Sequence, residues 1–280
     1  MNGRCKIIKS LFFLSVFFLV QSQLIAQKDY ARSIMDSLCS PHYDGRGYVN
    51  NGDVRAADFI IAELQKIGAQ SFQEFPFDQP YKLNVNTFPY PILVVLGDDT
   101  LKPGDDYILD PNSGTAAGEF ELIEINSENY NTVYGGKVKL DLEKKSQRVY
   151  VFNFTDVTDK EKLKEIRAYA NDAMNYFPTI WVTRSKKTYS VGRSQKNYPL
   201  IELDSADYKY AEKVQLKINN KYIPKYESKN VIGCIPGKKK NKYVVLTAHY
   251  DHLGRMGSDT YFPGANDNAS GCAMLLSLAK

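Results

Sequence analysis

The spacing of hydrophobic and polar residues changes along the chain, and each change marks a region with a different predicted structure. From Asp53, the stretch "DVRAADFIIAELQKIGA" repeats apolar residues at helical spacing and ends at Gly68, which predicts a helix. Residues 85–225 carry short apolar runs bounded by Gly, Pro, Asn and Asp, which predict β-strands. One helical stretch, "TDKEKLKEIRAYANDAMNY", interrupts these strands over residues 158–176.

After Asn230 the pattern predicts a strand, a long loop and a helix, an order typical of α/β folds. The run "YVVLTA", residues 243–248, is apolar on both faces, which predicts an interior strand covered by helices on each side. The helix after Asp267 is expected to begin with Asn268 or Ser270 as its cap. We therefore expect an α/β fold, a mostly parallel mixed sheet flanked by helices, with an inserted α+β domain.

The first 26 residues predict an export signal that is not part of the fold. A basic start is followed by the apolar run "LFFLSVFFLV", which is short for a membrane span, and then by a polar stretch ending at Ala26. A cleavable signal peptide predicts a secreted, periplasmic or cell-envelope protein without stable membrane insertion. The alternative is a short membrane anchor.

Charge and cysteine content narrow the function further. Cleavage after Ala26 lowers the formal charge from +4 to +1, because it removes three basic residues and no acidic one. So small a charge gives no electrostatic reason to expect nucleic-acid binding. The remaining cysteines, Cys39, Cys234 and Cys272, are odd in number and widely spaced, so they do not form a disulfide framework.

Candidate chemistry lies where the predicted strand 243–248 ends. His249 and Asp251 follow that strand, and alternate side chains of an extended backbone point the same way. Asp251 can therefore orient the His249 imidazole and raise its basicity, as an outer partner of a metal ligand does. Asp267 lies in a glycine-containing loop directly before a predicted helix, and its two oxygens could bridge two cations.

A histidine and a carboxylate are ligands of hydrolytic zinc sites. The alternative is structural, with His249 a hydrogen-bonded residue at a strand end and Asp267 a helix cap. His252 points away from His249 in an extended backbone, so we expect it to pack or to bond locally.

The segments "SKNVIGCIPG", "YVVLTAHYDHLG" and "PGANDNASG" occur in this order and closely resemble peptidase family M28. These zinc metallopeptidases include secreted bacterial aminopeptidases. The stretch from Ser40 to Ala69 resembles the segment that opens these enzymes, and "YPLIELDSADY" resembles part of a protease-associated insert. The resemblance divides the chain into a signal peptide, the N-terminal part of the peptidase domain, a protease-associated-like insert and the start of the catalytic core, at residues 1–26, 27–84, 85–225 and 226–280.

The resemblance implies that His249 binds one zinc, that Asp267 bridges two zinc ions, and that Asp251 is the catalytic-site residue that orients His249. It also implies a glutamate base, a second glutamate, an aspartate and a histidine after Asp267. Residues 268–280 contain no Asp, Glu or His. We therefore expect an N-terminal fragment, truncated within the catalytic domain and inactive by itself.

The resemblance implies an exported zinc-dependent exopeptidase acting on peptides, most specifically an aminopeptidase that hydrolyses N-terminal residues with a water activated by two zinc ions. One alternative is a non-catalytic binding protein on the same fold, which the intact His249, Asp251 and Asp267 disfavour. Another is a carboxypeptidase, dipeptidase or glutaminyl cyclase activity on the same scaffold.

Overall fold

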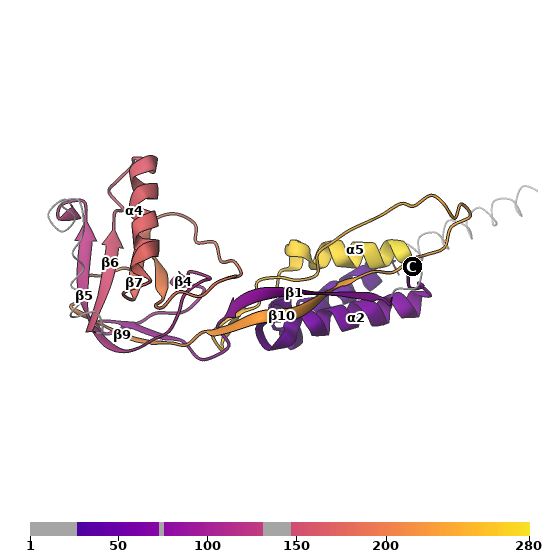
Figure 1. Cartoon of the computed structure of the whole chain (residues 1–280), viewed down its shortest axis with the longest axis horizontal. Helices are drawn as coiled ribbons and strands as arrows, with labels where there is room; N and C mark the ends of the chain where they lie inside the picture. Colours follow the sequence, from indigo (N-terminus) through magenta and orange to yellow (C-terminus); the bar gives the residue numbers. More distant parts are fainter. Residues whose placement is uncertain (1–26, 73–75, 131–146) are drawn as a thin grey trace, which may run out of the picture.

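The structure of the protein is a computed structural model that describes residues 27–72, 76–130 and 147–280. The predicted signal peptide lies outside the described residues. The described chain forms two regions at opposite ends of an elongated molecule (Figure 1). We call residues 93–218 the insert region and the other described residues the site region.

An eight-stranded mixed sheet forms the insert region, with the order β3-β2-β9-β5-β6-β7-β8-β4. Strands β5 to β8 run parallel in sequence order, and the outer pairs are antiparallel. This architecture confirms a mixed α/β fold. The strands are β2 (Leu93–Leu96), β3 (Asp99–Thr100), β4 (Tyr107–Leu109), β5 (Ala116–Asn126), β6 (Arg148–Asn153), β7 (Thr179–Thr183), β8 (Leu200–Asp204) and β9 (Lys213–Ile218).

Helix α4 (Lys160–Ala173) begins where the sequence predicts a helix start. The Asp159 side chain accepts hydrogen bonds from the Glu161 and Lys162 amides, so it satisfies two donors that the first helical turn leaves free. The helix buries Ile166 and Ala170 in a core that also holds Phe152, Trp181 and Phe177. A second and larger core joins strands of this sheet with Phe88 and Met256.

The site region combines helices with a two-stranded ribbon. Strands β1 (Asp78–Thr87) and β10 (Lys221–Val231) pair antiparallel and lead the chain into and out of the insert region (Figure 1). Residues 27–38 are helical, α2 is Gly52–Ile67, and α5 is Ser270–Ala279. The short elements are η1 (Pro41–Arg46), η2 (Val49–Asn51), β11 (Arg255–Met256), β12 (Thr260–Tyr261) and η4 (Ala265–Ala269).

Helices α2 and α5 confirm their sequence patterns. Gly68 ends α2 with a left-handed φ of 84°, a conformation that glycine adopts without a steric penalty. The apolar faces of the two helices meet the helical residues 27–38 in one core, whose buried members include Leu38, Ala56, Cys272 and Leu276. None of the described helices is long and apolar enough to cross a membrane.

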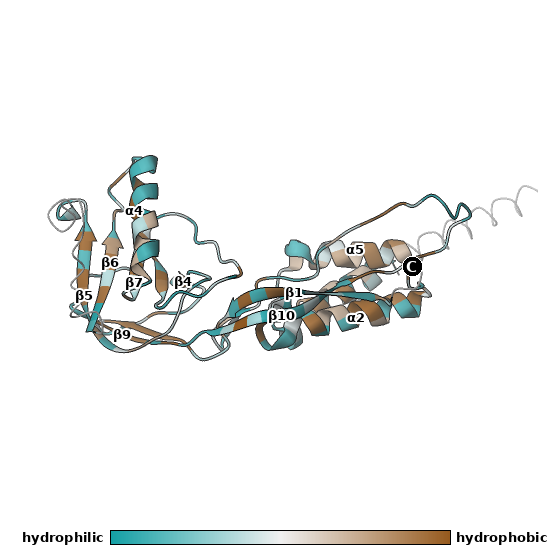
Figure 2. Cartoon of the chain, in the orientation of Figure 1, coloured by the Kyte–Doolittle hydropathy of each residue, from teal (hydrophilic) through white to brown (hydrophobic). Residues whose placement is uncertain are grey.

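The predicted interior strand over residues 243–248 is wrong. These residues form no strand, and the side chains of Val244 and Val245 are 91% and 78% exposed. Figure 2 colours this stretch brown where the chain returns from the right-hand end of the molecule. A strand needs a neighbour for its hydrogen bonds, and among the described strands β10 pairs only with β1. The parallel strands therefore lie in the insert region and not in a sheet beside the site.

Hairpin β11–β12 links the two regions. It lies between His252 and Pro263 in the sequence, yet Met256 is fully buried in the larger core of the insert region. The Gly257 amide donates to the Phe88 carbonyl (2.9 Å), and the Leu109 amide donates to the Met256 sulfur (3.3 Å). The loop that joins the two site motifs is thus anchored in the insert.

Candidate metal centre

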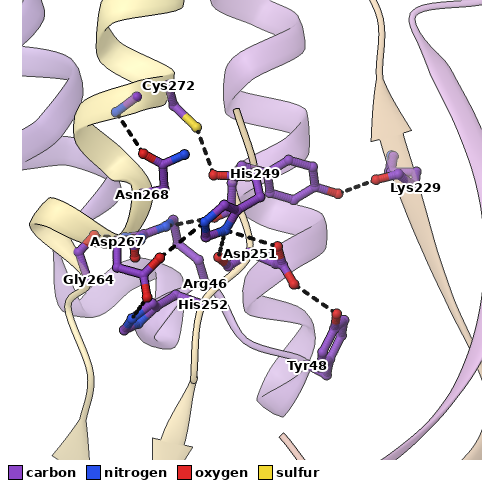
Figure 3. A network of polar contacts seen from close by, with 12 residues as sticks. Arg46, Tyr48, Lys229, His249, Asp251, His252, Gly264, Asp267, Asn268 and Cys272 are labelled. Carbon is purple, nitrogen blue, oxygen red and sulfur yellow. Dashed lines mark hydrogen bonds and ion pairs between the residues drawn. The ribbon is translucent and has the colours of Figure 1, made fainter. Parts of the chain in front are cut away.

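The three side chains that the sequence selects come together beside α5 (Figure 3). His249 Nε2 lies 3.1 Å from Asp267 Oδ1. His249 Nδ1 faces the other way, 3.1 Å from the Asp251 carbonyl oxygen and 3.5 Å from Asp251 Oδ1. The imidazole therefore lies between two aspartates, with Asp251 on its Nδ1 side and Asp267 on its Nε2 side.

The contacts around His249 indicate whether His249 and Asp267 are suited to bind a metal ion. Both oxygens near His249 Nδ1 are acceptors, so in the neutral imidazole Nδ1 carries the proton and Nε2 keeps its lone pair. That lone pair then faces the Asp267 carboxylate, and two electron-rich groups at 3.1 Å attract only when a proton or cation lies between them. Nitrogen and carboxylate oxygen are both zinc donors, so the residues present fit zinc.

The ligand set within the described chain is small. The described residues contain no group of three or more His, Cys, Asp or Glu side chains arranged to hold a metal ion. The His249 and Asp267 side chains are 54% and 68% exposed, so both donors are open to solvent. The pair can thus supply two ligands and leaves room for others.

His252 bonds locally, as the sequence predicts, but it also faces the site. Its side chain is 9% exposed, and Nδ1 lies 3.1 Å from the Phe262 carbonyl oxygen. Its Nε2 lies 3.5 Å from Asp267 Oδ2, on the opposite carboxylate oxygen from His249. Burial lowers the pKa of His252 and favours the neutral ring. The alternation rule missed this contact because residues 249–252 do not form a strand.

Tyr48 holds Asp251, and sequence reasoning missed it. The Tyr48 hydroxyl donates a 3.0 Å hydrogen bond to Asp251 Oδ2, while Asp251 Oδ1 faces His249. Burial and the nearby Asp251 charge raise the pKa of Tyr48, so the hydroxyl stays protonated and remains a donor. Tyr48 lies some two hundred positions before Asp251, in a turn-rich loop without a periodic pattern, so no local signal marks it.

Arg46 is the second residue that sequence reasoning missed. It is fully buried, and its guanidinium donates to main-chain carbonyls in both site motifs. Burial lowers the pKa of Arg46, while the neighbouring Cys39 and Cys272 thiols and the Asp251 carboxylate act to raise it. An arginine in a loop of polar and glycine residues predicts solvent exposure, which is why the sequence did not single it out.

The Asn268 side chain caps the start of helix α5. Its side-chain oxygen accepts a 3.2 Å hydrogen bond from the Gly271 amide, which satisfies a donor of the first turn of α5. Neither η4 nor α5 has a side-chain hydrogen bond from its own N-cap residue, and Asp267 instead points its carboxylate at the two histidines. The peptide bond between Asp267 and Asn268 is cis. The geometry thus disfavours the reading of Asp267 as a helix cap.

Cysteine chemistry does not enter the site. Cys39, Cys234 and Cys272 are free thiols, and Cys272 is buried with Sγ 3.3 Å from the His249 carbonyl oxygen. Burial raises the pKa of the Cys272 thiol to about 11, which keeps it protonated and unreactive at neutral pH.

Comparison with known proteins agrees with this fold and motif set. Residues 230–280 match the family model of Peptidase family M28. No curated protein matches the chain. Three bacterial structures share its fold. An aminopeptidase from Aneurinibacillus sp. strain AM-1 matches with a TM-score of 0.51 and 16% identity, over 90% of this chain and 57% of that one. The zinc aminopeptidase BSAP from Bacillus subtilis matches with a TM-score of 0.53 and 18% identity, over 90% of this chain and 56% of that one. A Peptidase M28 precursor from Shewanella amazonensis SB2B matches with a TM-score of 0.50 and 14% identity, over 91% of this chain and 62% of that one.

The chain is therefore a mixed α/β protein that shares the fold of these aminopeptidases. At 14% to 18% sequence identity, the similarity shows the fold alone. The chain spans between 56% and 62% of the length of these three proteins. The matched segment holds His249, Asp251 and Asp267, so the part of the chain that carries the candidate site is similar to peptidase family M28.

Proposed function

We propose that the protein is an exported zinc-dependent aminopeptidase that removes N-terminal residues from peptides. The observation that carries this proposal is the His249–Asp267 pair, with the imidazole nitrogen 3.1 Å from the carboxylate and Asp251 behind the ring. The family match covers the same residues. The zinc aminopeptidase from Bacillus subtilis, with the same fold, supports the choice of metal and reaction.

In this proposal each residue has one role. His249 would hold one zinc ion, and Asp267 would be a ligand shared by two zinc ions. Asp251 keeps the proton on Nδ1, so that Nε2 presents its lone pair to the metal. Zinc, when bound, lowers the pKa of a coordinated water and polarises the scissile carbonyl.

The rest of the described chain supports these roles by orientation. Tyr48 fixes one oxygen of Asp251, which leaves the other oxygen for the His249 ring. His252, held by the Phe262 carbonyl, faces the second oxygen of Asp267 and limits its rotation. In this proposal, residues 1–26 are a cleavable export signal and residues 85–225 are a protease-associated-like insert.

The proposal is tested by hydrolysis of leucine p-nitroanilide by the whole protein, compared with its N-acetylated form. We expect cleavage of the free amine only, with loss of activity on chelation and recovery with Zn²⁺. His249→Ala and Asp267→Ala should lower kcat/KM more than about 100-fold, because even outer partners of metal ligands change activity about 10–100-fold.

His42→Ala is the matched control, since His42 is exposed and its ring packs against Tyr43. Its kcat/KM should stay within about twofold of the wild type. Cleavage that survives chelation, or that prefers the N-acetylated substrate, would overturn the proposal.

A further inference from the structure

Arg46 is buried without any exposed surface, and it has no carboxylate on its guanidinium. All five of its N–H groups instead donate to main-chain carbonyl oxygens, and Figure 3 includes Gly264 and Asp267 among these partners. Nε donates to Tyr250 (2.7 Å), Nη1 to Leu38 (3.0 Å) and Pro263 (2.6 Å), and Nη2 to Gly264 (2.8 Å) and Asp267 (3.1 Å).

Four of these five acceptors belong to the two proposed ligand motifs, and the fifth, Leu38, lies at the end of the first helix. Tyr250 lies between His249 and Asp251, whereas Gly264 and Asp267 belong to the second motif. The guanidinium therefore bonds both motifs at once, beside the two side chains that face each other at 3.1 Å. A planar fork with fixed donor directions sets the separation of its acceptors, which a flexible ammonium group cannot do.

The backbone of Arg46 reinforces this link. Its carbonyl accepts a 3.0 Å hydrogen bond from the His252 amide, and the Gly45 carbonyl accepts one of 3.2 Å from Gly254. Asp44 and Arg46 both have left-handed φ values, 47° and 50°, which are unfavourable for residues with a side chain. Such a conformation persists when the surrounding contacts determine it, and it is concentrated at functional sites.

We propose that Arg46 is a positioning residue of the metal site, which fixes the His249 ligand relative to the Asp267 ligand through their main chains. This inference rests on the proposed zinc site. Burying a guanidinium is costly, and here five carbonyl acceptors, and not a carboxylate, offset that cost. Its five carbonyl partners instead connect three chain segments: the end of the first helix at Leu38, the segment 249–252 and the loop 263–267.

The test is metal binding by the chain, measured by calorimetric titration with Zn²⁺ and by the visible spectrum of bound Co²⁺. Arg46→Lys keeps the charge but cannot reproduce five donors, and it should weaken Zn²⁺ binding by about 10-fold or more, as outer partners of metal ligands do. It should also alter the Co²⁺ spectrum, because the ligand geometry changes. A merely structural residue would leave that spectrum unchanged in the folded variant.

Arg55→Lys is the matched control. Arg55 also donates to two carbonyls, those of His42 and Asn50, and it pairs with Asp44, but none of its partners belongs to a ligand motif. Its variant should bind Zn²⁺ within about twofold of the wild type. An Arg46→Lys variant that folds and also binds within twofold would overturn the inference.

If Arg46→Lys does not fold, the positioning role of Arg46 is tested in the wild-type chain by NMR. Zn²⁺ should then shift the NMR resonance of the Arg46 Nε–H group and leave that of Arg55 in place, and an unmoved Arg46 resonance would overturn the inference. His249→Ala separates the two proposals. If that variant binds Zn²⁺ as tightly as the wild type, the zinc site itself is wrong and both fail; if it loses binding and Arg46→Lys does not, only the Arg46 role fails.

Discussion

The insert region and the site region are stabilised by different interactions. In the insert region, strands of one sheet bury apolar side chains in two cores, one of which also packs α4. Among the described residues, the charged ones that are buried are Arg46, Asp53 and Glu63, and all belong to the site region. Both regions thus bury apolar side chains, and the site region adds directional polar contacts of buried charged groups that fix geometry.

This difference has a functional reason. Apolar packing tolerates changes of shape, but a metal site requires ligands at defined positions and orientations. The metal site proposed above would explain why the site region carries buried charged groups, and its hairpin β11–β12 gains apolar burial in the insert. The insert can then be expected to stabilise the site through Met256.

The largest predicted effect tests whether the insert region is independently stable. Phe177 is fully buried and its ring centroid lies 4.7 Å from that of Tyr150, so Phe177→Ala should lower the free energy of unfolding by about 3–5 kcal/mol. Urea unfolding followed by tryptophan fluorescence measures this, because Trp181 is the only tryptophan of the chain and lies in β7.

The control is Tyr176→Ala, since Tyr176 is 43% exposed and should change stability by no more than about 0.5 kcal/mol. Hydrogen exchange should accelerate in β6 and β7 and stay unchanged in α2. Equal acceleration in α2 would mean that the two regions unfold as one unit, and the comparison would be wrong.

The next effect tests the link between the regions. Met256→Ala leaves a cavity in the insert core and should lower the free energy of unfolding by about 2–5 kcal/mol. Because Met256 lies between the two ligand motifs, hydrogen exchange should accelerate both in strands β2 and β4 and in residues 249–267. Met274→Ala, at a residue 59% exposed on α5, provides the control and should leave both segments unchanged. Acceleration confined to β2 and β4 would show that the hairpin does not support the site.

The sequence predicted what depends on local pattern. Helices α2, α4 and α5 have apolar residues at helical spacing with recognisable start or stop residues, and each lies where that spacing predicts. The proposed ligand motifs stand out in the sequence because His249 and Asp251 are two residues apart and Asp267 lies in a distinctive loop. Each of these signals is contained within its own stretch of about twenty residues.

What the sequence could not predict depends on distant partners. Tyr48 and Arg46 contact the site across more than two hundred positions, so their roles appear only when the chain is folded. The prediction of a strand over residues 243–248 was wrong because it also depended on a distant partner. Its residues have strand propensity, but strand formation also requires a neighbouring strand, which sequence periodicity does not report.

A smaller effect concerns pH and the buried carboxylate of the site region. Asp53 is fully buried and accepts hydrogen bonds from Tyr226 (2.6 Å) and Ser228 (2.7 Å). Burial raises the pKa of Asp53 above its ordinary value of 3.8, so the folded state holds this proton more tightly than the unfolded state does. The contribution is therefore fully present below the unfolded pKa and is lost as pH rises through the folded pKa.

We expect the stability of the wild type relative to Asp53→Asn to fall as pH rises above about 4, since only the wild type carries this titrating group. The measurement is urea unfolding of both proteins at a series of pH values, followed by far-ultraviolet circular dichroism. A difference that stays constant, or that grows with pH, would contradict the predicted sign.

The smallest effect tests the exposed segment 243–248 directly. Valine and threonine are nearly isosteric and both β-branched, so a Val→Thr substitution mainly reports whether the side chain is buried. Val244 is 91% exposed, and Val244→Thr should change the free energy of unfolding by no more than about 0.5 kcal/mol. Val151 in β6 is fully buried, and Val151→Thr should cost about 1–3 kcal/mol because it buries a hydroxyl.

Urea unfolding followed by circular dichroism compares the two variants. If Val244→Thr costs as much as Val151→Thr, the segment is buried in solution and lies in a sheet, as its apolar pattern predicts. Apolar packing of this segment would then support His249, and Arg46 would no longer be needed to explain how the two proposed ligand motifs are held together. If Val244→Thr is neutral, the segment leading to His249 has no sheet to support it, and the polar contacts around Arg46 must fix the position of that ligand.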